Sequence, residues 1–395
     1  MTPIRALYVH IPFCERKCEY CDFTSTAETG NRRDYISALN REIALLGERA
    51  PGVELDTVFV GGGTPSLIEP GSLATVLDAV RAAFRLAPGA EITLEANPSS
   101  TTTERAAVWL GAGFNRVSIG VQSLEPDVLT FLGRVHDSAR ALDAVEEVRA
   151  AGFVAVNTDL IYAVPGLDDA RWRSTLERIA ALAPGHISCY ELTVEPGTPL
   201  HTSVRRGRVT PVDTDVALRQ HGVALDVLEQ AGYAHYEVSN FAGAGQECRH
   251  NLAYWHNDFY LAAGVGAHGH LPAAVARDVL EVSTGDAVAV RYRHGRGISA
   301  YIAAVEGGAL PLQDHELVDE LAHEQERLML GLRLRDGVVI ADERVLGEAA
   351  VLRDAGFLTI SDGIVRVTSA GERVLNALTL RLTSVLEPPR THATI

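Results

Sequence analysis

Short β-branched runs alternate with longer helical segments along the first 235 residues. The runs predict six strands, at residues 7–9, 58–60, 91–94, 116–119, 154–160 and 186–192. The segments between them carry apolar residues at helical spacing, most clearly at 34–46, 73–84, 140–150 and 170–182. A strand followed by a helix, repeated in this way, is typical of a parallel sheet. Six such units predict an α/β fold, a partial (β/α)6 barrel that stays open on one side.

The pattern after the sixth strand predicts a further helix and a separate C-terminal domain. A loop precedes a helix that we expect to begin with Thr210 as its cap and Pro211 as its first residue. The last hundred residues hold helical segments and then a hairpin at 356–367, turning at Asp362-Gly363, which suggests an α+β winged-helix-like domain. The predicted division is a barrel at 1–235, a connecting segment at 236–310, a winged-helix-like domain at 311–386 and a tail at 387–395.

The charge balance narrows the function classes. The 395 residues carry a net charge of −16, which argues against a nucleic-acid binder. Residues 321–380 hold 7 arginines and 9 acidic residues, so the winged-helix-like part lacks the positive charge that DNA phosphates require. No run reaches the roughly 18 apolar residues of a membrane span, and the first 13 residues show no secretory pattern. We therefore expect a cytoplasmic protein with at most peripheral membrane contact.

Three of the five cysteines form the strongest chemical signal. Cys14, Cys18 and Cys21 follow the first predicted strand directly, in a C-x3-C-x2-C loop. A four-iron cluster normally takes four cysteines, so three would leave one iron open to another ligand. A zinc site with His10 as fourth ligand is the alternative, and a disulfide framework is disfavoured in a reducing compartment. Cys189 and Cys248 lie far away in sequence and are expected to be buried and without a role in the cluster.

Polar residues and glycines follow the ends of the predicted strands. Parallel barrels place their chemistry at the carboxyl ends of the strands, so these residues are expected to converge. A single acid in such a position is more often a helix cap, and a glycine run is equally explained by a tight turn. The residues in question are Gly62, Gly63, Thr64, Glu95, Gln122, Arg134 and Asp159.

The cysteine loop resembles that of radical S-adenosylmethionine (SAM) enzymes, a superfamily that uses a six-unit partial barrel. The resemblance implies a 4Fe–4S cluster on Cys14, Cys18 and Cys21, with SAM bound at the open iron. Within this superfamily, the chain resembles the oxygen-independent coproporphyrinogen III oxidase family. The resemblance rests on segment 8–14 and on the Gly-Gly-Gly-Thr-Pro, Gly-Val-Gln-Ser and Asp-Leu-Ile-Tyr motifs. That family implies SAM contacts at Tyr8, Gly62, Gly63, Thr64, Glu95, Gln122, Arg134 and Asp159.

Two departures favour one branch of this family. The oxidases carry a further cysteine two positions after the third cluster cysteine, where this chain has Phe23. The H-N-x-x-Y-W motif of the haem chaperones of the HemW type is present as His250, Asn251, Tyr254 and Trp255. An imidazole can ligate haem iron while aromatic rings contact the macrocycle. The alternative for this motif is a packed aromatic corner with a hydrogen-bonded histidine, and Cys248 is either a second haem ligand or a small buried residue.

Three function hypotheses follow. The first is a haem chaperone that holds haem, a 4Fe–4S cluster and SAM and delivers haem to haem-dependent, respiratory proteins. The second is a coproporphyrinogen III oxidase that decarboxylates two propionates, an activity that Phe23 argues against. The third, a metal-binding regulator with a winged-helix tail, is disfavoured by the acidic charge. The chaperone hypothesis implies haem-accepting proteins and an electron donor, such as a flavodoxin or reductase, as partners; a homodimer stays open.

Overall fold

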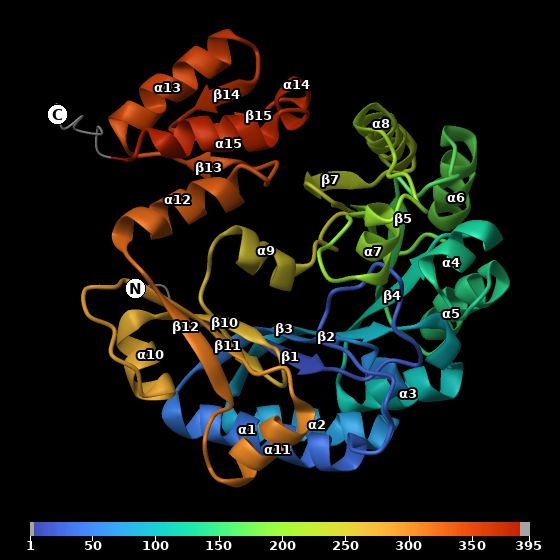
Figure 1. The fold of residues 1–395 in the computed structure, drawn as a ribbon, viewed down its shortest axis with the longest axis vertical. Coiled ribbons are helices and arrows are strands. Elements are labelled where there is room, and N and C mark those ends of the chain that lie inside the picture. Colours follow the sequence, from blue (N-terminus) through green and yellow to red (C-terminus); the bar gives the residue numbers. More distant parts are fainter. Residues whose placement is uncertain (1–3, 388–395) are drawn as a thin grey trace.

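A computed structural model describes residues 4–387 and shows a twelve-stranded sheet with six parallel strands at its centre (Figure 1). Each of these six strands pairs with the next in parallel register. All six predicted strands are therefore confirmed, and the fold is the partial α/β barrel that the pattern indicates. The strands are β1 (Ala6–Ile11), β2 (Glu54–Gly62), β3 (Arg85–Ala96), β4 (Arg116–Gln122), β5 (Ala155–Tyr162) and β6 (His186–Glu191).

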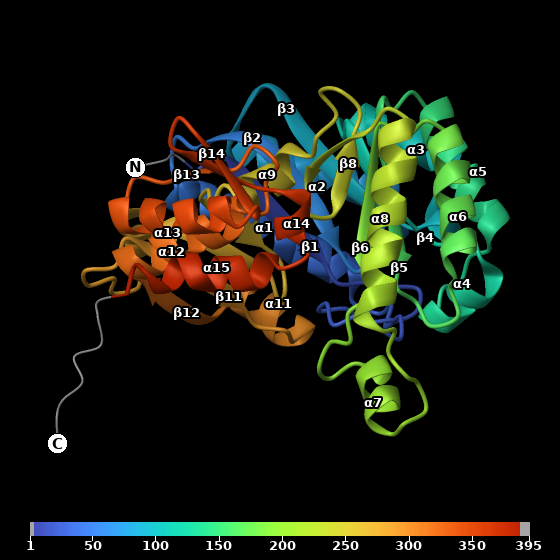
Figure 2. The same ribbon diagram turned by 90° about the horizontal axis from the view of Figure 1, so that it is seen from above.

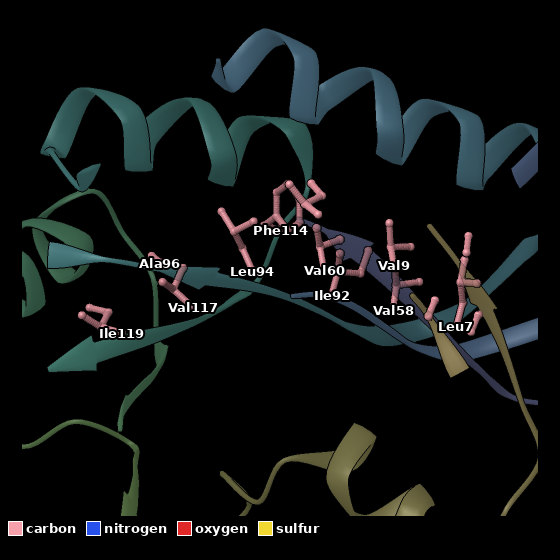
Figure 3. Packing of buried hydrophobic residues seen from close by; sticks show 14 of the residues in the cluster. Leu7, Val9, Val58, Val60, Ile92, Leu94, Ala96, Phe114, Val117 and Ile119 are labelled. Carbon is pink, nitrogen blue, oxygen red and sulfur yellow. The ribbon is translucent and has the colours of Figure 1, made fainter. Parts of the chain in front are cut away.

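Helices cover the outer face of these strands, because alternate strand residues there are apolar. Leu7, Val9, Val58 and Val60 point toward the helices in Figure 3 and are fully buried. Burying a side chain of this size stabilises the fold by about 1.5–3 kcal/mol. The helices are α1 (Arg32–Arg49), α2 (Pro70–Ala83), α3 (Thr103–Ala112), α4 (Pro126–Leu132), α5 (Ser138–Ala150) and α6 (Asp169–Ala181), with 3-10 turns η1 (Pro65–Leu67) and η2 (Pro98–Ser100).

The sheet extends beyond the barrel at both edges. Strands β8 (Asn240–Ala242) and β7 (Ala234–Glu237) add to β6 as antiparallel neighbours. At the other edge, β9 (Tyr260–Ala263) pairs with β1, and the antiparallel strands β10 (His268–Pro272), β11 (Ala289–His294) and β12 (Leu312–Val318) follow. Helix α9 (Arg249–Trp255) connects β8 to β9, so it crosses the open side of the barrel from one edge to the other.

The sheet therefore reaches Val318, so the expected connecting segment, and the first residues of the expected C-terminal domain, are part of it. The helices around this extension are α7 (Pro199–Arg205), α8 (Thr214–Gln230), α10 (Ala273–Leu280) and α11 (Ile298–Glu306). Helix α7 projects from the body of the molecule in Figure 2.

A second hydrophobic core begins with α12 (Glu320–Gly331). Its small antiparallel sheet has the order β13-β15-β14, and Asp362 and Gly363 both have positive φ, at 52° and 76°. Two positive φ angles are required by a type I′ turn, so the predicted hairpin is confirmed. The elements are β13 (Val338–Val339), α13 (Glu343–Asp354), β14 (Leu358–Ser361), β15 (Ile364–Val367), α14 (Ser369–Glu372) and α15 (Leu375–Ser384).

The start of α8 corrects one expectation. The helix begins at Thr214, and Thr210 and Pro211 remain in the loop before it. Asp213 is the cap, because its carboxylate accepts a hydrogen bond of 2.8 Å from the backbone N–H of Asp215. Within residues 4–387, no helix has both the length and the apolar character that a membrane crossing requires. Of the expected tail, residues 388–395 lie outside the described part of the chain.

Candidate functional site

The cysteine loop between β1 and α1 is closed by backbone hydrogen bonds. The N–H of Cys14 donates to the carbonyl of Thr26, and the N–H of Thr26 donates to the carbonyl of Pro12, each at 2.8 Å. Phe13 anchors the loop from inside, since its ring is buried and meets Tyr35 edge-on at 5.4 Å. The loop thereby carries all three cysteines to the wall of one cavity of about 440 Å³.

The three thiols are not gathered as closely as the ligands of a single metal ion. Around a single zinc, with sulfur at about 2.3 Å, tetrahedral geometry brings the sulfurs to about 3.8 Å from one another. Among the described residues, these three sulfurs do not all lie within 4.8 Å of one another. Both ring nitrogens of His10 are also engaged, by the carbonyl of Thr24 at 2.7 Å and the hydroxyl of Tyr8 at 3.0 Å. A zinc site completed by His10 therefore does not fit.

The buried thiols need a neighbouring positive charge in order to ionise to thiolates. Burial raises the pKa of Cys21 to about 11, and the neighbouring Cys18 and Cys14 oppose its ionisation further. Arg134 supplies one cation, because its guanidinium donates to the sulfur of Cys18 at 3.4 Å. An iron–sulfur cluster would supply the rest, since metal ions bind the thiolate form. The donor set of this loop fits such a cluster.

The glycine turn at the end of β2 packs directly against this loop. A Cβ atom on Gly62, whose φ is 119°, would lie 2.6 Å from the His10 ring. A Cβ atom on Gly63 would lie 2.9 Å from the sulfur of Cys14. Only glycine allows so close an approach, so this turn holds the cysteine loop in place.

The N–H groups of this turn are already used within the protein. Gly62 donates to the Glu95 carboxylate at 2.9 Å. Gly63 and Thr64 donate to backbone carbonyl groups of residues 11 and 13, at 2.8 and 2.7 Å. In this conformation the N–H groups of the turn are therefore not available to a ligand.

Two carboxyl groups line the cavity, Glu95 from β3 and Asp159 from β5, the strands on either side of β4. Burial raises the pKa of Glu95 to about 8, and burial also raises the pKa of Asp159. Asp159 is held in position by the Ser118 hydroxyl and the Asn157 amide, each donating at 2.8 Å. A ligand that brings positive charge would stabilise both carboxylates, and SAM, with its sulfonium and amino groups, has this chemistry. The cavity therefore fits SAM beside the cysteines.

Gln122 is the last residue of β4, and Arg134, which follows α4, reaches this strand with its side chain. The Arg134 guanidinium donates to the carbonyl of Gly120 at 3.0 Å and to the side chain of Asn97. Gln122 has a φ of 65°, a left-handed conformation that non-glycine residues adopt rarely and often at functional sites. Because Arg134 also contacts a cluster cysteine, the structure places it at the boundary between the cysteine loop and the strand ends.

Tyr8 lines a second, inner cavity of about 210 Å³ instead of the first. The two cavities share Gly62, Glu95 and Asp159 among their lining residues, so they adjoin along the axis of the barrel. The inner cavity is also lined by His250, Asn251 and Tyr254, on the helix that crosses the open side of the barrel.

His250 lies at the opposite end of the barrel from the cysteines. Its ring bonds to the hydroxyl groups of Thr57 and Tyr254, each at 2.8 Å, and stacks on Phe59 at 5.1 Å. Thr57 is in the first half of β2, whereas the cysteines meet the far end of that strand. His250 is 1% exposed, both of its nitrogens are engaged, and with Tyr254 it lines the inner cavity.

The rest of the motif anchors α9. The backbone N–H groups of Arg249 and His250 both donate to the Glu91 carboxylate at 3.1 Å. The side chain of Trp255 bonds to Glu237, a carboxyl group whose pKa burial raises to about 7. Ligation of haem iron by His250 would require both hydrogen bonds of its ring to break, and this role stays a prediction.

Several residues of the larger cavity do not stand out in the sequence. Ser118 and Asn97 orient Asp159 and Arg134, and Tyr190 lies at the end of β6. Asn97 follows Glu95 by two residues in the Glu-Ala-Asn-Pro motif, which is a signal that could have found it. Ser118 carried no signal, because a serine inside an apolar strand is common.

The parallel partial barrel and the three-cysteine cavity at its carboxyl end define a radical SAM protein, and residues 8–179 match the model of the Radical SAM superfamily. A heme chaperone HemW of Mycobacterium tuberculosis is 38% identical over 91% of this chain and 88% of its own. The heme chaperone HemW of Escherichia coli is 40% identical over 68% of this chain and 70% of its own. The chain therefore belongs to the HemW branch of the oxygen-independent coproporphyrinogen III oxidase family.

Two further similarities agree with this assignment. A mitochondrial radical S-adenosyl methionine domain-containing protein 1 of Danio rerio is 32% identical over 94% of this chain and 85% of its own. The solved coproporphyrinogen III oxidase HemN of Escherichia coli, a radical SAM enzyme, has the same fold, with a TM-score of 0.78 over 97% of this chain and 90% of its own. Its sequence identity is 20%, so the likeness concerns the fold alone. Membership of the superfamily implies a 4Fe–4S cluster and SAM.

Proposed function

We propose that this protein is a haem chaperone that holds a 4Fe–4S cluster and SAM and delivers haem to haem-dependent, respiratory proteins. The observation that carries the proposal is Phe23, which is 59% exposed and lines both cavities. A phenyl ring can neither ligate iron nor transfer a proton, and it stands where the oxidases have a cysteine. The relatives named heme chaperone HemW support the same choice.

In this proposal Cys14, Cys18 and Cys21 hold the cluster, and SAM occupies the larger cavity. With both groups bound, the pair supplies one-electron chemistry. Glu95 and Asp159 balance the positive charge of SAM, and the glycine turn at Gly62 and Gly63 leaves room for it beside the cysteines. Tyr8, Thr64, Gln122 and Arg134 complete the set of side chains proposed to contact SAM.

Haem enters this proposal as cargo, held by the segment that contains His250, Asn251, Tyr254 and Trp255. The inner cavity, at about 210 Å³, is smaller than the roughly 300–1,000 Å³ of ordinary ligand pockets. Haem binding by this segment therefore needs α9 to leave its place across the barrel. The protein would then exist in a closed and an open form, and haem would shift the population toward the open form only as far as it binds that form more tightly than the closed one.

An anaerobic experiment on one reconstituted sample tests the proposal against the oxidase alternative. The chaperone proposal expects saturable haem binding, no release of carbon dioxide from coproporphyrinogen III, and haem transfer to an apo haem protein. Turnover of coproporphyrinogen III without saturable haem binding would restore the oxidase. A reductant such as a reduced flavodoxin serves as electron donor, and light scattering determines whether the protein is a dimer.

A further inference from the structure

A second group of metal-ligating side chains lies away from both cavities. His270, His323 and Glu326 each place one ligand atom within 4.8 Å of the others, and they form the one such group within residues 4–387. His270 comes from β10, the third strand from one edge of the large sheet, whereas the other two come from α12. None of the three lines the cavity of the cysteines or the inner cavity beneath it.

His270 is prepared to be a ligand. It is 3% exposed, and its Nδ1 lies 3.4 Å from the carbonyl of Asp258. Donation to that carbonyl places the ring proton on Nδ1 and leaves a lone pair on Nε2. Within the described part of the chain, Nε2 is buried and has no hydrogen-bond partner. Metal-binding histidines characteristically donate their other N–H to a carbonyl or carboxylate in this manner.

An unpartnered buried imidazole nitrogen indicates a missing partner, because a buried polar atom without one is costly.

The two ligands from α12 share one face of the helix, three residues apart. The amide of Asn257 lies 3.4 Å from Nδ1 of His323. An amide can donate to this nitrogen or present its oxygen to it, so it can hold either tautomer of the ring. Phe259 packs beside both histidines, with its ring 4.8 Å from His270 and stacked at 6.0 Å on His323, while the two imidazole rings are 6.0 Å apart.

Glu326 is 13% exposed, and its Oε1 is bonded to Arg291 at 2.5 Å. A carboxylate has about four lone-pair sites, so an arginine and a metal can share it. Arg291 has a second carboxylate partner, Glu316, at 3.0 Å, which balances its charge independently of Glu326. In β-sheet register Arg291 stands opposite His270, so the arginine positions the glutamate over the histidine.

We propose that His270, His323 and Glu326 bind a divalent first-row transition metal ion such as Zn²⁺, which ties α12 to strand β10 of the large sheet. Two imidazoles and one carboxylate are a usual ligand set for zinc, with a water molecule in the fourth position. Ligands within 4.8 Å of one another close around an ion at about 2.0–2.2 Å by small side-chain rotations.

The site would bridge the two hydrophobic cores of the molecule. His270 lies on the sheet of the first core, and α12 begins the second. Figure 1 shows α12 between the C-terminal elements and the sheet, near α9. Asn257, which contacts His323, follows the end of α9 by two residues. The ion would therefore fix the C-terminal domain next to the helix that closes the barrel.

The test is calorimetric titration of Zn²⁺ into the cluster-loaded full-length protein after treatment with a mild chelator. Iron content and cluster absorbance are measured before and after, so that exchange at the cysteines is detected. The variants are His323→Ala and Glu326→Gln, because both residues are only partly buried and these changes leave the buried His270 in place. The control is His315→Ala, which removes an exposed histidine from the neighbouring strand β12.

We expect one equivalent of Zn²⁺ to bind with the cluster intact and to raise the melting temperature. Substituting His323 or Glu326 should weaken binding at least about 10-fold, since even outer-shell changes at metal sites have effects of 10–100-fold. His315→Ala should bind as the parent does. The inference is overturned if no Zn²⁺ binds while the cluster stays loaded, which would leave a water molecule as the partner of His270. It is also overturned if binding is unchanged in both ligand variants.

Discussion

Replacing His250 with alanine tests whether this residue locks α9 across the open side of the barrel. The ring bonds to Thr57 on β2 and to Tyr254 on its own helix, and it stacks on Phe59. Without the ring, the buried Thr57 hydroxyl loses this partner, and the helix loses its side-chain tie to the strand. The two backbone bonds to Glu91 remain, so the change isolates the contribution of the imidazole.

The expected magnitude follows from these contacts. Two lost hydrogen bonds contribute about 1 kcal/mol each, and the lost aromatic contact about another 1 kcal/mol. Since 1.4 kcal/mol is a factor of about ten, a loss of about 3 kcal/mol should raise the local opening of α9 more than 100-fold. Opening of one segment in this way is a local unfolding event, separate from global unfolding.

Amide hydrogen exchange of the peptide that covers Arg249–Trp255 measures this opening. We expect exchange in this peptide to be about 100-fold faster in His250→Ala, with little change in β4 or β5. The matched control is His256→Ala, which removes the exposed histidine that follows the helix and should leave the exchange unchanged. Equal protection of this peptide in the parent and in His250→Ala would refute the reasoning, because α9 would then be held by other contacts.

Further predictions concern haem, the cluster and the strand ends. Thr57→Val removes one hydrogen bond to His250. If haem binding requires the release of α9, haem affinity in this variant, measured by absorbance titration, should rise about 5-fold, the ratio that corresponds to 1 kcal/mol. Weaker haem binding would argue against release of α9. Cys18→Ser should abolish cluster absorbance and bound iron after reconstitution, whereas the buried Cys189→Ser should retain both; loss in both variants would contradict the assignment. Asp159→Ala should weaken SAM binding by calorimetry while iron content stays constant, and unchanged affinity would count against the strand-end site. Burial raises the pKa of Glu95 to about 8, so the folded protein keeps this proton to a higher pH than the unfolded chain. Rising pH between about 4.5 and 8 therefore favours unfolding, and Glu95→Gln should gain melting temperature relative to the parent across this window. A constant difference would show that Glu95 is ionised in the fold.

Most of the barrel could be predicted from the local pattern of apolar residues. Each parallel strand is buried on its helix-facing side, so its apolar run is visible without knowledge of its neighbours, and the carboxyl ends of such strands must converge. The placement of Glu95 and Asp159 at one cavity follows from this rule. The start of α8 did not follow, because Pro211 and Asp213 are both good starting signals and the carboxylate of Asp213 reaches the N–H of Asp215.

The environment of His250 could not be predicted, because it depends on contacts between residues far apart in the sequence. His250 and Thr57 are 193 residues apart, and nothing near either residue in the sequence indicates that they bond. The motif around His250 suggests an imidazole presented to a ligand, whereas the topology returns it to the amino-terminal half of β2, where a hydroxyl group occupies each ring nitrogen. The same topology brings His270 to α12 across more than fifty residues. Whether a histidine can ligate a metal depends on the hydrogen-bond partners of its two ring nitrogens, and the fold determines these partners. Both nitrogens of His250 bond to hydroxyl groups. Nε2 of His270 has no hydrogen-bond partner among the described residues. By this criterion His270 is the better prepared of the two to bind a metal in the described conformation, whereas the haem proposal requires α9 to move before His250 can act as a ligand.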